Sequence, residues 1–361
     1  MSTRTVDRTP AEDEAGSSRQ ASGRNPVSPL VLILAVGCSI SFWYLMHFRD
    51  QAEKATVTAD EATKELEVAR KKLEVAEPQA RLGDLSQLTG LRDKQYDFTV
   101  NSYGYDFIGN TADLVDSQVL MYGLWQKGLA FFLRDFLKKS ENPNAVFLDI
   151  GSNVGHHSLF LASQCAAVHG IEPNEAAAKR FQAMIDHNEM KNVFVHGVGF
   201  GSEAGELPYY PPAEGTLIGG TFQEKIGGPR GTTAVPLPVV RGDDWVAETA
   251  LTGISLIRVS MEGYEEPILQ GLHNTLVAQR PVVVVEVTPA PRGTIESLEQ
   301  FKSLFPENYD FISLTGSLST TMVDGKYGSR PFGTELAKRF FAGDRKATYV
   351  GYPVEKKLQV P

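Results

Sequence analysis

From Tyr96 onward, short runs of apolar residues alternate with segments whose apolar side chains repeat at helical spacing. The runs typical of buried strands are Ala145–Ile150, Ala167–Ile171, Val193–Val198, Ile254–Ser260, Pro281–Val287, Asp310–Leu314 and Ala347–Tyr352. Helical spacing occurs within residues 119–137, 157–165, 176–185 and 266–278. Strands that alternate with helices predict βαβ units, and hence a mostly parallel sheet with helices on both faces. The last two strands lack a long helix between them, which predicts a hairpin at one edge.

One apolar stretch near the N-terminus stands apart from this pattern. Leu30–Phe48 contains no Asp, Glu, Lys or Arg, and as a helix its nineteen residues would rise about 28 Å, close to the core of a bilayer. Phe42, Trp43 and Tyr44 cluster near one end, where aromatic rings favour the water–lipid interface. With Pro29 at its start, we expect residues 29–48 to form a single-pass membrane anchor. A cleaved signal peptide fits less well, because the preceding tail is long and no Ala-x-Ala site follows.

The segments on either side of this anchor are polar. Residues 1–28 have few large apolar side chains and predict a disordered tail. Residues 50–80 carry Ala and Leu at alternating spacings of four and three until Pro78, which predicts a helical stalk. The stalk is compatible with a coiled coil that joins copies of the chain and with a solvated spacer, and its many alanines favour the spacer. We expect an N-terminal helical extension or lid over 81–140, followed by the main domain over 141–361.

Composition narrows the function classes. The 361 residues are 42% hydrophobic and 22% charged, which is typical of a globular protein. The net charge of −9 argues against a nucleic-acid partner, because binding a phosphate backbone needs clustered Lys and Arg. The two cysteines, Cys38 and Cys165, exclude a disulfide framework and a cysteine-rich zinc site.

Polar residues at the ends of two predicted strands indicate a ligand site. Open α/β sheets bind ligands outside the carboxyl ends of their strands. The first strand leads into a glycine turn, Asp149–Gly155, whose backbone can approach a ligand closely and which opens a helix with free amide donors. Glu172 ends the next strand 21 residues after Gly151, an offset typical of a carboxylate that binds two ribose hydroxyls. The spacing therefore predicts a nucleoside cofactor.

The same residues limit which nucleoside is expected. A dinucleotide needs G-x-G-x-x-G so that its pyrophosphate can lie on the helix start, but Asn153 stands where the middle glycine should be. The carboxylate of Asp149 would repel phosphates and suit a cation. S-adenosylmethionine has an ammonium and a sulfonium but no phosphate, so it is the expected cofactor, although the turn could also serve the fold alone. The predicted cofactor-binding residues are Asp149, Gly151, Ser152, Asn153, Gly155 and Glu172.

Four segments then follow one another in a specific order. They are Phe147-Leu-Asp-Ile-Gly-Ser-Asn-Val-Gly-His-His-Ser-Leu-Phe160, Gly170-Ile-Glu-Pro-Asn174, Leu256-Ile-Arg-Val-Ser-Met-Glu-Gly-Tyr-Glu265 and Pro281-Val-Val-Val-Val-Glu-Val287. In this order they resemble the FkbM family of S-adenosylmethionine-dependent methyltransferases, over roughly residues 140–290. The resemblance implies a Rossmann-like class I methyltransferase fold with a seven-stranded sheet, and O-methylation, commonly of a sugar or another hydroxylated metabolite. It says nothing about the tail, the anchor or the stalk.

One position departs from the family pattern. The family usually has I-D-x-E-G at the end of the fourth strand, whereas this chain has Ser260 in place of the acid, followed by Glu262. Because a serine is a poor base, the departure implies weakened activity, an inactive relative, or transfer of the role to Glu262. The catalytic candidates are Glu262, Ser260 and His156, of which Glu262 is favoured. The alternatives are a carboxylate that stabilises a helix N-terminus for Glu262 and a structural role for His156.

Three hypotheses about function follow. The first is a membrane-anchored methyltransferase that acts on a hydroxyl of a saccharide or small metabolite, with the glycine-rich loop 201–231 as the acceptor-binding element. The second is a non-catalytic membrane protein whose Rossmann-like head binds a nucleoside or a partner, and the third is a nicotinamide-dependent oxidoreductase, which the missing glycine disfavours.

The histidines show no metal-ligand spacing, so no zinc requirement is expected. The charges flanking the anchor are nearly balanced and do not select a side of the membrane; cytosolic synthesis of the cofactor favours a cytosolic head, with a lumenal head as the alternative.

Overall fold

The computed structural model describes residues 96–212, 217, 219–227, 233–315, 328–331 and 346–356. The predicted tail, membrane anchor and stalk lie outside these residues. Within the described part of the chain, no helix is both long and apolar enough to span a bilayer.

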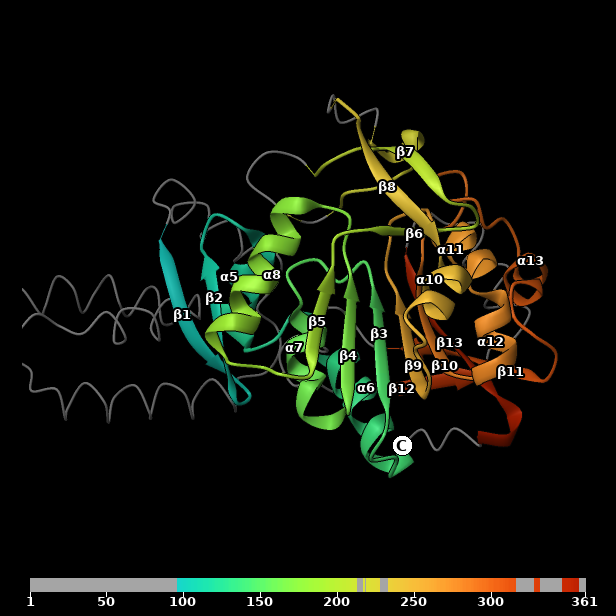
Figure 1. Ribbon diagram of the computed structural model, residues 1–361, viewed down its shortest axis with the longest axis horizontal. Coiled ribbons are helices and arrows are strands. Elements are labelled where there is room, and N and C mark those ends of the chain that lie inside the picture. Colours follow the sequence, from blue (N-terminus) through green and yellow to red (C-terminus); the bar gives the residue numbers. More distant parts are fainter. Residues whose placement is uncertain are drawn as a thin grey trace, which may run out of the picture.

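A central sheet of eight strands organises the domain (Figure 1). From one edge to the other its strands are β12 (Gly328–Pro331), β11 (Tyr309–Thr315), β13 (Ala347–Pro353), β10 (Val282–Val287), β9 (Ile254–Val259), β3 (Val146–Ile150), β4 (Ala167–Ile171) and β5 (Val193–His196). The five strands from β10 to β5 pair in parallel, whereas β13 pairs antiparallel with both of its neighbours. All seven predicted strands are present in this mostly parallel Rossmann-like sheet, and the short β12 adds an eighth at the edge.

Each buried strand presents alternate residues to two hydrophobic cores. On β3, Phe147 packs into the core beneath α5 (Leu114–Tyr122), α6 (Lys127–Ser140), α7 (His156–Leu161) and α8 (Glu175–His187). The next residue, Leu148, packs into the core beneath α10 (Gly242–Glu248), α11 (Glu265–Gly271), α12 (His273–Gln279) and α13 (Leu298–Ser303). Burial on both faces explains why strands such as β10 are uninterrupted runs of apolar residues.

The order of the strands locates the ligand edge. The chain enters the sheet at β3, continues outward through β4 and β5, and then returns to the other side of β3 with β9 and β10. This reversal opens a crevice at the carboxyl ends of β3 and its neighbours. A separate three-stranded sheet of β6 (Gly199–Gly201), β8 (Val235–Arg241) and β7 (Gly205–Tyr209) lies above this edge in Figure 1. The predicted loop 201–231 therefore contains β7 and the short α9 (Glu224–Gly227).

The segment before β3 differs from the expected helical extension. Its described part begins with an antiparallel hairpin of β1 (Asp97–Ser102) and β2 (Tyr105–Asn110), which lies beside α8 in Figure 1. The helical pattern predicted within 119–137 is divided, because Gly123 adopts a left-handed φ of 83° and ends α5. Leu124 and Trp125 therefore precede α6 instead of lying within it. The pattern over 266–278 is similarly divided between α11 and α12, at Leu272.

Candidate functional site

The glycine turn after β3 needs its glycines for steric reasons. Gly151 has a φ of +76°, and a Cβ at this position would lie 2.2 Å from the carbonyl oxygen of Ser260. Gly155 has a φ of +84° at the start of α7, and its Cβ would lie 2.2 Å from the ring of Phe181. Left-handed backbone and close packing each exclude a larger residue here. These two glycines hold the turn at the crevice between β3, β4 and β9.

Glu172 at the end of β4 is bound directly to this turn. Its carboxylate accepts hydrogen bonds from the backbone N–H of Asn153 and from that of Asn174, both at 2.8 Å. Burial, partly offset by these two hydrogen bonds, raises the pKa of Glu172 to about 7. A carboxylate has about four acceptor positions, so two remain for the vicinal hydroxyls of a ribose.

The donor set in this crevice fits S-adenosylmethionine. Glu172 can bind the ribose, and the backbone of the turn carries no phosphate-binding middle glycine because Asn153 occupies that position. The hydroxyl oxygen of Ser152 is buried without a hydrogen-bond partner within the described residues, and it lies beside Gly170 of β4, beneath the turn. Glu172 and the backbone of the glycine turn are the groups that would hold the cofactor.

Asp149 does not meet the cofactor in the way that its position in the sequence predicts. The carboxylate is fully buried; one oxygen accepts a hydrogen bond from the hydroxyl of Ser158 at 2.7 Å, and the other pairs with Arg258 at 2.9 Å. Arg258 lies on β9 opposite Asp149 and also contacts the carboxylate of Glu286 at 2.5 Å. We call Asp149, Arg258 and Glu286 the buried charge cluster. The guanidinium of Arg258 already pairs with the carboxylate that was expected to face the ammonium of the cofactor. Asp149 therefore joins β3 to β9 and, through Ser158, to α7.

The first catalytic candidate, Glu262, is an ion-paired carboxylate just beyond β9. One of its oxygens lies 3.1 Å from Arg292 and 3.1 Å from Lys346. A general base must take up a proton, and protonation of Glu262 would break both ion pairs. These contacts therefore make Glu262 a poor general base. Glu262 precedes α11 without being its N-cap, which is Tyr264.

The other two candidates occupy different environments. Ser260 is partly buried at the tip of β9, where its backbone N–H donates to the carbonyl of Ile150 at 2.9 Å. His156 is buried, and its ring stacks on Phe107 with 4.8 Å between ring centroids. Burial, with the nearby positive charges of Arg180 and Arg258, lowers the pKa of His156 to about 3. This environment corrects the prediction for His156: it is a neutral core residue that packs the extension onto α7.

Glu265 is a charged group that sequence reasoning missed. One of its oxygens accepts from the backbone N–H groups of Gly263 at 3.1 Å and Thr288 at 3.2 Å, which joins the turn after β9 to the end of β10. The other oxygen has no partner within the described residues, and burial raises the pKa to about 7. The only local signal was its place three residues after Glu262, which is also typical of an ordinary helix start.

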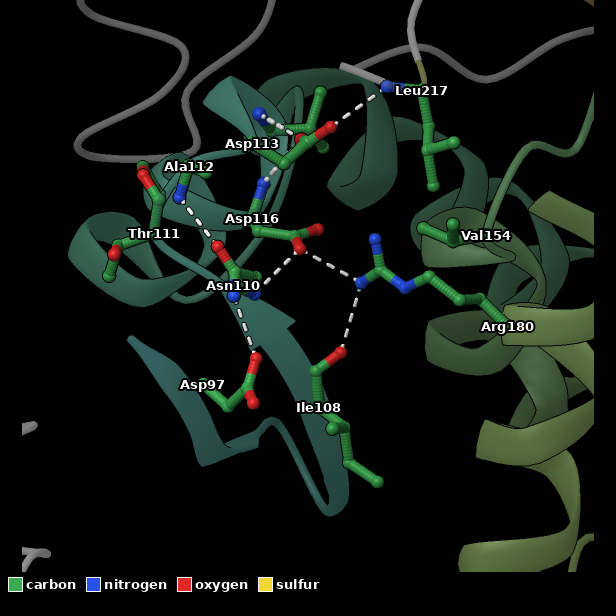
Figure 2. Close-up of polar contacts among 12 residues, drawn as sticks. Asp97, Ile108, Asn110, Thr111, Ala112, Asp113, Asp116, Val154, Arg180 and Leu217 are labelled. Carbon is green, nitrogen blue, oxygen red and sulfur yellow. Dashed lines mark hydrogen bonds and ion pairs between the residues drawn. The ribbon is translucent and has the colours of Figure 1, made fainter. Parts of the chain in front are cut away.

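Leu217, in the loop 201–231, links the extension to the glycine turn, and Figure 2 shows its contact with Asp113. The N–H of Leu217 donates to Asp113 at 2.9 Å, and its carbonyl accepts from the side chain of Asn153 at 2.5 Å. Nearby, Asp116 pairs with Arg180 of α8 at 2.9 Å, and burial raises the pKa of Asp116 to about 6. The extension thus packs on α7 and α8 through contacts such as the Phe107–His156 stack and the Asp116–Arg180 ion pair.

Part of the chain is similar to known methyltransferases. Residues 149–313 match a family model described as the methyltransferase FkbM domain. The hexuronic acid methyltransferase AglP of Haloferax volcanii is 24% identical over 171 residues, which cover 47% of this chain and 67% of that protein.

Two solved structures are also similar. Methyltransferase FkbM from Methylobacillus flagellatus KT has a TM-score of 0.38 at 14% identity; the match covers 74% of this chain but 59% of that one, less than two thirds of its length. The O-methyltransferase from Bacillus cereus in complex with SAH has a TM-score of 0.34 at 10% identity, covering 63% of this chain and 80% of that one.

Residues 149–313 are similar to the methyltransferase FkbM domain, and the cofactor is S-adenosylmethionine. The resemblance inferred from the four ordered segments is confirmed for this domain.

Proposed function

We propose that the chain is a membrane-tethered O-methyltransferase that transfers the methyl group of S-adenosylmethionine to a hydroxyl of a saccharide. The observation that supports the proposal most is the hydrogen bond from the backbone N–H of Asn153 to Glu172, because a carboxylate beside the glycine turn is suited to binding a ribose. The similarity to a hexuronic acid methyltransferase supports a sugar as the acceptor.

The chemistry needs alignment more than proton transfer. When bound, S-adenosylmethionine would supply the methyl group and leave as the neutral thioether, and the proton of the acceptor hydroxyl would pass to water. Glu172 and the turn orient the donor, and alignment of this kind accounts for much of the rate of such displacements. Ser260 lies at the tip of β9, and its hydroxyl positions the acceptor oxygen by a hydrogen bond, because a serine is a poor base.

Cofactor binding tests the proposal. The full-length protein is purified in detergent and titrated calorimetrically with S-adenosylhomocysteine. Glu172→Gln should lower the affinity by at least about tenfold, because it weakens hydrogen bonds between the ribose and a charged group. Glu175→Gln is the matched control, since Glu175 is exposed at the start of α8 and pairs with Lys179. Absence of binding by the unmodified protein would refute the enzyme and support a head that binds another partner.

Membrane tethering is tested separately. The uncharged stretch Leu30–Phe48 supports a single membrane span. Carbonate washing of isolated membranes should therefore fail to extract the protein. Val36→Asp places a charge near the middle of the stretch and should release the protein or prevent its insertion. Ser17→Asp, in the polar tail, is the control and should leave the protein in the membrane fraction. Release of the unmodified protein by carbonate would contradict the tether without affecting the assignment of the reaction.

A further inference from the structure

Three segments that are distant in sequence meet at the carboxyl edge of the sheet. Glu262 follows β9, Arg292 lies in the loop after β10, and Lys346 immediately precedes β13. Both cations approach the same oxygen of Glu262, each at 3.1 Å. We call these three residues the edge charge cluster. It combines two positive charges with one negative charge.

The two cations are much more exposed than the carboxylate that joins them. The side chains of Arg292 and Lys346 are 41% and 39% exposed, whereas that of Glu262 is 12% exposed. Within the described residues, neither cation makes another hydrogen bond or ion pair, so most of their N–H donors remain available. An incoming group therefore meets positive charge before it meets Glu262.

The neighbouring carboxylates are withdrawn from this surface. Glu265 is buried, and its pKa of about 7 leaves it partly protonated at neutral pH. Glu286 is buried and paired with Arg258. The positive charge of Lys346 acts to lower the pKa of both carboxylates, but neither of them reaches the surface. Among the described residues of this edge, the exposed charges of the cluster are therefore the two cations.

The cluster also lies against the loop expected to bind the acceptor. The hydroxyl of Thr221 donates to the backbone carbonyl of Glu262 at 2.5 Å. A Cβ on Gly263 would lie 2.5 Å from the side chain of Ile226 in α9, which shows that α9 packs directly on the turn after β9. Ser260, at the tip of β9, is two residues before Glu262. The edge charge cluster is thus part of the wall that faces an acceptor.

We propose that Arg292 and Lys346 bind a carboxylate of the methyl acceptor, which makes the acceptor an acidic saccharide. This inference rests on the proposed function and adds the substrate class. The single excess positive charge of the cluster matches a carboxylate, whereas a phosphate monoester brings close to two negative charges and would leave an excess. Arg292 provides planar paired donors and Lys346 a point charge, a combination suited to a carboxylate that is held in one orientation.

The test measures sugar binding by the full-length protein in detergent, saturated with S-adenosylhomocysteine. The probes are methyl β-D-glucuronide, methyl β-D-glucoside and glucose 6-phosphate. The binding of each probe is measured by ligand-observed NMR titration. We expect the glucuronide to bind at least about tenfold more tightly than the neutral glucoside, as one charge-assisted hydrogen bond would produce. Arg292→Gln and Lys346→Gln should each remove most of this preference, and Arg292→Lys should retain part of it.

Controls separate this inference from loss of the fold and from failure of the proposed function. Lys179→Gln removes an exposed positive charge on α8, away from the edge, and should keep the full preference. Unchanged S-adenosylhomocysteine affinity in the Arg292 and Lys346 variants shows that they are folded. Equal binding of the two glycosides, no binding of either, or a preference for the phosphate overturns the inference, while cofactor binding still supports a methyltransferase.

Discussion

Two ion clusters occupy neighbouring places in this protein and have opposite composition. The buried charge cluster has two carboxylates, Asp149 and Glu286, on one cation, Arg258, and all three side chains are nearly inaccessible to solvent. The edge charge cluster has one carboxylate between two cations that are each about two fifths exposed. A buried charge must be satisfied within the protein, so the first cluster holds strands together; an exposed excess charge can be satisfied by a ligand, so the second is suited to binding.

The largest difference is expected when the cation of the buried cluster is removed. Arg258→Met leaves Asp149 and Glu286 buried without a counter-charge, and we expect it to lower the free energy of unfolding by about 3–5 kcal/mol. Urea unfolding of the full-length protein at pH 7 measures this loss. A loss below about 1 kcal/mol would show that the cluster does not support the fold and would remove the contrast.

Glu265 sharpens the comparison because it is buried without a cation bound to it. Burial raises its pKa from 4.5 to about 7, so the folded protein binds this proton more tightly than the unfolded chain does. Its contribution to stability is therefore greatest below pH 4.5 and decreases as the pH rises through 7, by up to about 3 kcal/mol. Glu265→Gln should reduce the fall in unfolding free energy between pH 5 and pH 8. An identical fall in the variant would show that Glu265 does not contribute to it.

A smaller loss of stability is expected when Ser158, the uncharged hydrogen-bond partner of the buried charge cluster, is replaced. The hydroxyl of Ser158 donates to Asp149 at 2.7 Å, and Ser158→Ala would leave that oxygen with no donor. We expect a loss of about 1–3 kcal/mol in unfolding free energy, measured as above. Ser163→Ala, at an exposed position just after α7, should cost little. Equal losses in the two variants would indicate a general effect of alanine in this region.

The smallest effect is expected at the edge charge cluster. Arg292→Met removes an ion pair that is screened by solvent, so the unfolding free energy should fall by less than about 1 kcal/mol. This variant is also the matched partner of Arg258→Met, because both remove an arginine that pairs with a carboxylate. Losses of similar size in the two would contradict the division between a structural and a binding cluster.

The sequence predicted the central sheet well because its strands are buried on both faces. Such a strand appears in the sequence as a local run of apolar residues, and turn residues mark its ends. The same local logic located the glycine turn and Glu172, which are close in sequence and lie on consecutive strands. The hairpin of β1 and β2 in the extension was not predicted from the sequence. Its turn is formed by Tyr103 and Gly104, both with positive φ, and tyrosine is an unusual residue for such a turn.

What the sequence could not determine was the partner of each charge. A carboxylate at the end of a strand can pair with a cation of a ligand or with a cation of the protein, and the sequence does not distinguish the two. Asp149 was therefore predicted to bind the cofactor. Its cation is Arg258, 109 residues away, which only the pairing of β3 with β9 brings alongside. Glu262, Arg292 and Lys346 likewise belong to three separate segments. The amino-acid pattern determines which residues form strands and turns through local interactions, whereas tertiary packing decides which charges are buried together and which remain available to a ligand.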